Sequence, residues 1–156
     1  MHRNAKLIGL FGLIACAGPP PHASPVKQPN ALTQVRWLEG RWTGTQQNGQ
    51  VFFEGYHFLN DSTIRTYSFA DSLSVGPTDS GTIQSRGATI TTGEGSALWA
   101  VDLLTADSVR FAPVRGARNT FVWRRVSADQ WVAVLSWPAT PDRAARRVEY
   151  LMRRGR

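Results

Sequence analysis

The sequence predicts an all-β fold, an antiparallel meander β-barrel of about eight to ten strands that follows one short N-terminal helix. From Arg41 onward, apolar and polar residues alternate with period two in short runs, which is the pattern of antiparallel strands with one buried face. Turn-forming clusters such as Asn48-Gly49 and Gly76-Pro77-Thr78-Asp79 separate the runs. Roughly 125 residues carry this pattern, a length that suits one domain with one core.

The expected strands follow one another with brief connections, as in a meander. They lie near residues 41–46, 50–59, 63–70, 80–86, 88–93, 97–105, 108–114, 120–126, 130–137 and 146–153. We expect Gly93-Glu94-Gly95 to be a turn, since it is too short for a phosphate-binding loop and lacks a strand-loop-helix setting.

One helix is expected over residues 30–40. Asn30 is suited to cap its N-terminus, and Leu32, Val35 and Leu38 recur at helical spacing. Gly40 is a natural helix stop. We expect this helix to plug one end of the barrel with its apolar residues in the core.

The N-terminus predicts export and lipid attachment. A basic stretch over residues 1–6 precedes an uncharged apolar run to Ala15, which is typical of a secretory signal and too short to span a membrane. Leu13-Ile14-Ala15-Cys16 resembles the lipobox of bacterial lipoproteins, in which the cysteine receives diacylglycerol before cleavage. Cys16 is the only cysteine, so it has no intramolecular disulfide partner. We therefore predict a lipoprotein signal peptide at 1–15 and lipidation (palmitate included) of Cys16.

Residues 16–29 are rich in proline and show no hydrophobic periodicity, so we predict a tether there and a β-barrel domain at 30–156. The lipid on Cys16 makes a membrane the expected partner. Ala17, rather than an aspartate, follows the cysteine and favours the periplasmic face of the outer membrane within the cell envelope.

Basic residues gather in the last third of the chain. Without residues 1–15, 16 basic and 11 acidic side chains remain, and 11 of the basic ones, all arginine, lie within 110–156 beside only three acidic residues. Arginine interleaved with tryptophan also occurs in nucleic-acid-binding proteins. The export signal argues against that partner, so we expect no nucleic acid. An anionic envelope polymer or lipid headgroup is the alternative contact for this surface.

The opening of the barrel carries a resemblance. Trp37-Leu38-Glu39-Gly40-Arg41-Trp42-Thr43-Gly44 resembles the Trp-Leu-x-Gly-x-Trp-x-Gly opening of bacterial lipocalin-like β-barrel families, similar in pattern to calycins such as lipocalins and fatty-acid-binding proteins and to nitrobindins. The segment Arg147–Arg154 resembles the final strand of one such family. The resemblance covers roughly residues 31–154 and implies a barrel able to hold a small ligand.

The chain departs from that family where relatives carry an Asn-Pro-x-His-Asp-Phe-Pro segment. Here the corresponding residues 112–121 contain neither the histidine nor the aspartate. Haem ligation by analogy to nitrobindins therefore loses its candidate histidine, and we expect no cofactor.

The sequence offers little for catalysis. His57 is the only histidine of the expected domain, and it lies three residues after Glu54, so the two point to opposite faces of a strand. A serine nucleophile needs a base held by a third group, and a zinc site needs more ligands than one histidine supplies. We predict no catalytic residue and no metal site; an envelope hydrolase is the least supported reading.

The sequence is compatible with two hypotheses about what occupies the barrel interior. In the first, the interior binds or carries a small apolar or amphipathic molecule, and the candidate ligand-binding residues are Trp42, Glu54, Arg65, Tyr67, Trp99 and Arg124. Arg65 and Tyr67 share strand parity, which is one argument for that set. In the second, the aromatic residues fill the interior, and the protein is a structural or scaffolding lipoprotein with an arginine-rich contact surface.

Overall fold

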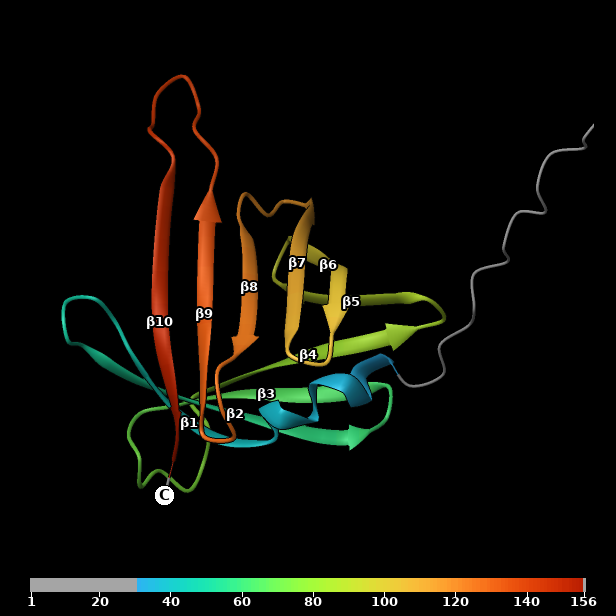
Figure 1. Ribbon diagram of the computed structural model, residues 1–156, viewed down its shortest axis with the longest axis vertical. Helices are drawn as coiled ribbons and strands as arrows, with labels where there is room; N and C mark the ends of the chain where they lie inside the picture. Colours follow the sequence, from blue (N-terminus) through green and yellow to red (C-terminus); the bar gives the residue numbers. More distant parts are fainter. Residues whose placement is uncertain (1–30, 156) are drawn as a thin grey trace, which may run out of the picture.

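The computed structural model describes residues 31–155, which form one 3-10 helix followed along the chain by a closed antiparallel barrel of ten strands (Figure 1). The elements are η1 (Ala31–Leu38), β1 (Gly40–Thr45), β2 (Val51–Asn60), β3 (Thr63–Phe69), β4 (Asp79–Arg86), β5 (Thr89–Glu94), β6 (Ala97–Thr105), β7 (Ser108–Arg115), β8 (Thr120–Arg125), β9 (Gln130–Trp137) and β10 (Arg146–Arg154).

Each strand pairs with its neighbours in sequence, and β1 closes the barrel against β10. The closing pair runs from Trp42 opposite Arg154 to Thr45 opposite Leu151. Figure 1 shows β6–β10 standing upright while β2–β5 run across them. Closure leaves every strand with two partners, so no sheet edge remains exposed.

The predicted fold class is confirmed, and every strand boundary lies within one residue of its expected position. The predicted turns form as well: Gly49 has a φ of +83° and donates its N–H to the carbonyl of Gln46 at 2.9 Å, and Gly95 has a φ of +56°. These positive φ values are ones that glycine adopts without strain. Among the described residues, no helix is long and apolar enough to cross a membrane.

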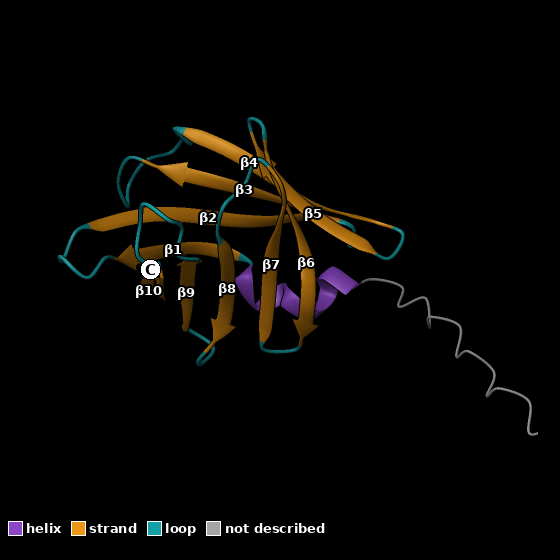
Figure 2. Cartoon of the chain, turned by 90° about the horizontal axis from the view of Figure 1, so that it is seen from above, coloured by secondary structure: helices purple, strands orange, loops and turns teal. Residues whose placement is uncertain are grey.

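The helical segment is a 3-10 helix rather than an α-helix. Val35 interrupts it with φ of −104° and ψ of +22°, and Gly40, at φ +114°, turns the chain into β1. Leu32, Val35 and Leu38 are almost completely buried, as expected of a plug. Figure 2 shows the helix beneath the strands at one end of the barrel.

The predicted signal peptide, the lipidated Cys16, the tether and the capping residue Asn30 all lie outside the described residues, as does Arg156 at the other terminus. The proposed domain boundaries therefore stay predictions.

Candidate ligand-binding site in the barrel interior

Large aromatic side chains fill the end of the barrel that η1 covers. Trp131 on β9 has no exposed surface, and its indole lies edge-on to the rings of Trp37 at 6.0 Å, Trp42 at 5.9 Å, Tyr56 at 5.9 Å and Trp123 at 5.6 Å between centroids. Edge-to-face packing of this kind is favourable for aromatic rings. This end of the barrel is therefore a packed core.

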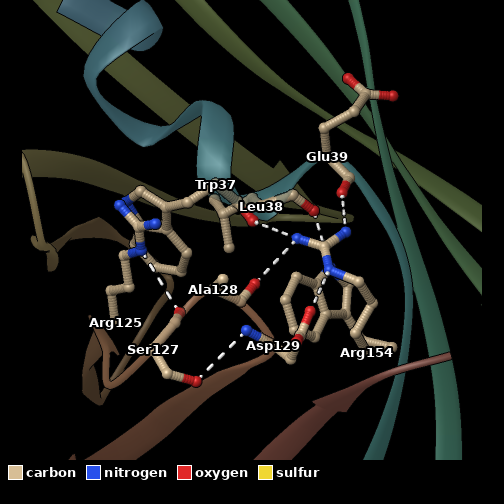
Figure 3. Close-up of polar contacts among 9 residues, drawn as sticks. Trp37, Leu38, Glu39, Arg125, Ser127, Ala128, Asp129 and Arg154 are labelled. Atoms are coloured by element: carbon tan, nitrogen blue, oxygen red, sulfur yellow. Dashed lines mark hydrogen bonds and ion pairs between the residues drawn. The ribbon is translucent and has the colours of Figure 1, made fainter.

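The side chain of Arg154 makes several polar contacts at the same end of the barrel (Figure 3). Its guanidinium donates hydrogen bonds to the carbonyls of Glu39 at 2.8 Å, Trp37 at 3.3 Å and Ala128 at 3.2 Å, and it pairs with Asp129 at 3.3 Å. The same group lies 4.3 Å from the centroid of the Trp42 ring. One side chain of β10 thus joins the turn after η1 to the loop between β8 and β9.

The other half of the barrel is hollow. A cavity of about 770 Å³ lies between inward-facing side chains of β2–β6, β8 and β9. Ligand sites for small molecules commonly have volumes of roughly 300–1,000 Å³. The cavity is therefore large enough for a small organic ligand.

Glu54 and Tyr56 stand side by side in the wall of this cavity. They are two residues apart on β2 and face inward together, and the Tyr56 hydroxyl donates a hydrogen bond to Glu54 Oε2 at 2.6 Å. Cavity space leaves part of the carboxyl reachable by water, while protein encloses it on most sides. This burial raises the pKa of Glu54, and the Tyr56 hydrogen bond partly offsets the rise.

Tyr56 is itself buried, and burial together with the charge and hydrogen bond of Glu54 raises the pKa of Tyr56 well above its ordinary value. Its hydroxyl therefore stays protonated and serves as a hydrogen-bond donor. A second space of about 300 Å³ reaches the pair from the other side and shares Glu54, Tyr56, Trp123 and Leu135 with the larger cavity. Glu54 thus stands where two interior spaces meet.

Aromatic rings form the wall opposite. Trp99 on β6 lies edge-on to Phe121 at 5.8 Å, Phe121 lies 5.5 Å from Trp123, and Trp123 lies 5.3 Å from Tyr56, again between centroids. The indole N–H of Trp99 donates to the carbonyl of Asn119 at 2.9 Å, which fixes the ring at the cavity wall. The wall is continuous from the mouth to the packed core.

The structure places three of the six candidate residues, Glu54, Tyr67 and Trp99, at the cavity wall. Tyr67 borders the cavity, but its ring lies beside Phe69 at 6.2 Å on the outer face, over Gly55. The Tyr67 ring therefore lies mainly on the outer face, and a role for this residue in ligand binding stays a prediction.

Three further candidates lie elsewhere. Trp42 faces inward but is packed into the closed end, with its indole N–H bonded to the carbonyl of Leu38 at 2.7 Å. Arg65 pairs with His57 across β2 and β3 on the outer face, because its neighbour Ile64 occupies the inward position. Arg124 is exposed because Trp123 takes the inward position beside it. These three residues therefore do not line this cavity.

Sequence reasoning missed Tyr56 as a site residue. It also did not separate Phe121, Trp123 and Trp137, which line the cavity, from the aromatic residues of the packed core. The signal that identifies Tyr56 is its parity, since it lies two residues beyond Glu54 on the same strand. Phe121 and Trp123 share parity on β8 in the same way.

His57 lies outside the cavity, opposite in direction to Glu54 as expected from their spacing. Its Nδ1 lies 3.0 Å from Glu39 Oε1, and its side chain is exposed. Burial raises the pKa of Glu39, but hydrogen bonds from the Phe58 N–H and from His57 outweigh it, so the pKa of Glu39 is lowered. Within residues 31–155, no group of three His, Cys, Asp or Glu side chains is placed to hold a metal ion.

No known family model matches the chain, and no curated protein matches it. Among solved structures, the chain is similar to EF1p2_mFAP2b bound to DFHBI, with 12% identity, a TM-score of 0.39 and coverage of 78% of this chain and 96% of that chain. It is also similar to a redesigned β barrel, b11L5F_LGL, with 13% identity, a TM-score of 0.39 and coverage of 83% and 99%. Nothing about a ligand of this chain follows from likenesses at that level.

Proposed function

We propose that this protein is a lipid-anchored component of the bacterial cell envelope whose barrel binds or carries a small amphipathic molecule without transforming it. The observation that carries the binding proposal is the cavity of about 770 Å³ beside Glu54 and Tyr56. A few polar groups among aromatic walls are the usual composition of a site that orients an amphipathic ligand.

The division of the barrel into two halves favours binding over scaffolding. The closed end contains the large buried side chains Trp42 and Trp131 that stabilise the fold. A purely structural barrel gains stability from filling the other half as well, because unfilled interior space lowers stability. The hollow half is therefore best explained by a ligand.

The anchor and the location rest on the sequence of residues 1–29. The lipobox-like Leu13-Ile14-Ala15-Cys16 supports lipidation, and Ala17 supports the outer membrane. The arginine-rich C-terminal third is a proposed contact surface for anionic envelope polymer, as a secondary role for the same protein.

The binding proposal is tested with a neutral apolar fluorophore, N-phenylnaphthylamine, titrated into the purified protein. We expect saturable enhancement of the fluorophore emission and parallel quenching of tryptophan emission, because Trp99 and Trp123 line the cavity. Leu135→Trp places a larger side chain in the cavity wall and should weaken binding, whereas the outer-face control Val122→Trp should not. The absence of saturable binding would contradict the proposal.

A further inference from the structure

The cavity has a charge opposite to that of the protein. The chain has 18 basic and 11 acidic residues and a net charge of +7. The residues that line the cavity nevertheless include the carboxylates Glu54, Asp79 and Glu94 and no lysine, arginine or histidine. An interior lined only by acidic charge in a basic protein favours a positively charged ligand.

The three carboxylates occupy different depths. Asp79 begins β4 and Glu94 ends β5, and both are exposed at the rim, on the strand positions that alternate with outward-facing residues. Glu54 lies deeper, where the two interior spaces meet. A cation that enters the barrel thus passes two acidic groups before it reaches a third.

Glu54 has one carboxylate oxygen available for a ligand. Tyr56 donates to Oε2, and among the described residues no basic side chain pairs with this carboxylate. A charged group within a protein is costly unless an opposite charge or hydrogen bonds compensate it. A ligand ammonium beside Oε1 supplies the missing charge.

The walls around Glu54 also suit a cation. The rings of Tyr56, Trp99, Phe121 and Trp123 surround the space, and aromatic faces attract cations electrostatically. Trp137, which lines the cavity near its mouth, already has the guanidinium of Arg146 at 4.9 Å from its ring centroid. The Trp137 ring thus shows this contact between a cation and an aromatic face, and Arg146 places one positive charge beside the rim without lining the cavity.

We infer that the ligand is an organic cation, an amine with a flat apolar body whose ammonium pairs with Glu54 while the body packs on Trp99 and Trp123. This inference rests on the proposed binding function and specifies its ligand class. Glu54 is the counter-ion, Tyr56 holds the carboxylate in place through its hydrogen bond, and Asp79 and Glu94 attract the cation to the mouth.

The test is isothermal titration calorimetry of the purified full-length protein with three probes that share an indole body. Tryptamine carries an ammonium, tryptophol a hydroxyl and indoleacetate a carboxylate. Near neutral pH we expect tryptamine to bind at least about tenfold more tightly than tryptophol, and indoleacetate to bind most weakly, because the head group faces Glu54. Equal affinity for tryptamine and tryptophol, or tighter binding of indoleacetate, would overturn the inference.

Two variants locate the effect. Glu54→Gln keeps an acceptor for the Tyr56 hydroxyl and should reduce tryptamine affinity about tenfold while it leaves tryptophol affinity nearly unchanged. Glu149→Gln removes the same charge from the outer face of β10 and should leave both affinities unchanged. An equal loss in the two variants would show a general charge effect and refute the role of Glu54.

The outcomes separate the inference from the proposed function. If N-phenylnaphthylamine and tryptophol bind but tryptamine has no advantage, the cavity binds ligands and the cation preference is wrong. If none of the probes binds saturably, the proposed binding function fails together with the inference. Thermal unfolding of Glu54→Gln checks that the variant is folded, and the comparison of probes on the unaltered protein does not depend on this variant.

Discussion

Replacement of two inward-facing tryptophans by alanine distinguishes the packed half of the barrel from the hollow half. Trp131 has no exposed surface and touches four other aromatic rings. Its N–H has no hydrogen-bond partner among the described residues, so Trp131→Ala removes packing alone. Deletion of a buried aromatic side chain typically costs about 3–5 kcal/mol of unfolding free energy, and we expect that range here.

Trp99→Ala should cost less. The variant loses the hydrogen bond to Asn119 and the edge contact with Phe121, but one side of the indole already faces the cavity. A hydrogen bond and an aromatic contact of this kind together contribute roughly 1–2 kcal/mol. Trp99→Ala should therefore retain about 2 kcal/mol more unfolding free energy than Trp131→Ala.

Equilibrium unfolding in urea, followed by circular dichroism, measures both differences under the same conditions. The slopes of the transitions should be similar, so that the midpoints report the free energies. A loss for Trp99→Ala as large as that for Trp131→Ala would mean that the barrel around Trp99 is packed, and the cavity would then be refuted.

Three further predictions follow from single residues. Because burial raises the pKa of Glu54, the folded state binds the proton of this carboxyl more tightly than the unfolded state does. The protonated Glu54 side chain therefore contributes to the unfolding free energy below the ordinary pKa of 4.5, and this contribution is lost as pH rises through the raised pKa. Glu54→Gln should hence raise the unfolding free energy near neutral pH and lose this advantage in acid; a penalty at neutral pH would contradict the burial of that carboxyl. Gly44→Ala should cost about 1–3 kcal/mol, because an added methyl group collides with the ring of Phe52. Gly76→Ala, with no atom within 4 Å of its added methyl group, is the control, and equal thermal stability of the two variants would be inconsistent with the inward position of Gly44. Cys16→Ser should release the protein from the membrane fraction or leave uncut precursor, whereas mass spectrometry that finds an unmodified mature N-terminus in the unaltered protein would rule out the lipid anchor.

The sequence predicts the strands so closely because period-two alternation is a local property. In β2, Phe52, Glu54, Tyr56 and Phe58 alternate with outward residues, and such runs identify a strand without knowledge of its partners. The 3-10 geometry of η1 is less predictable, since apolar spacing alone does not distinguish a short 3-10 helix from an α-helix.

Parity shows which residues share a face but not which face is inside. Arg65 and Tyr67 do lie on one face of β3, and it is the outer one. Gly55 leaves room there for aromatic rings, and Arg41 lies 4.0 Å from the centroid of the Phe69 ring, so the outer face of β1–β3 has an aromatic cluster of its own. The rule that aromatic residues face inward therefore fails at Tyr67.

The sequence does not predict where along the barrel the cavity lies, and the reason differs from that for Tyr67. Trp42 and Trp99 both face inward, but η1 and the rings around Trp131 fill the space beside Trp42 and leave the space beside Trp99 open. Whether an inward side chain lies in a core or a cavity depends on its height along the barrel, which follows from the stagger of all ten strands.

The central claim is that the hollow half of the barrel binds an amine beside Glu54. A crystal structure of the protein with a brominated tryptamine tests it most directly, because anomalous scattering from bromine locates the ligand independently of the surrounding density. We expect the bromine inside the barrel between Trp99 and Trp123, with the ammonium within hydrogen-bonding distance of Glu54. Bromine found only on the outer face, or an empty cavity at saturating ligand, would contradict the claim.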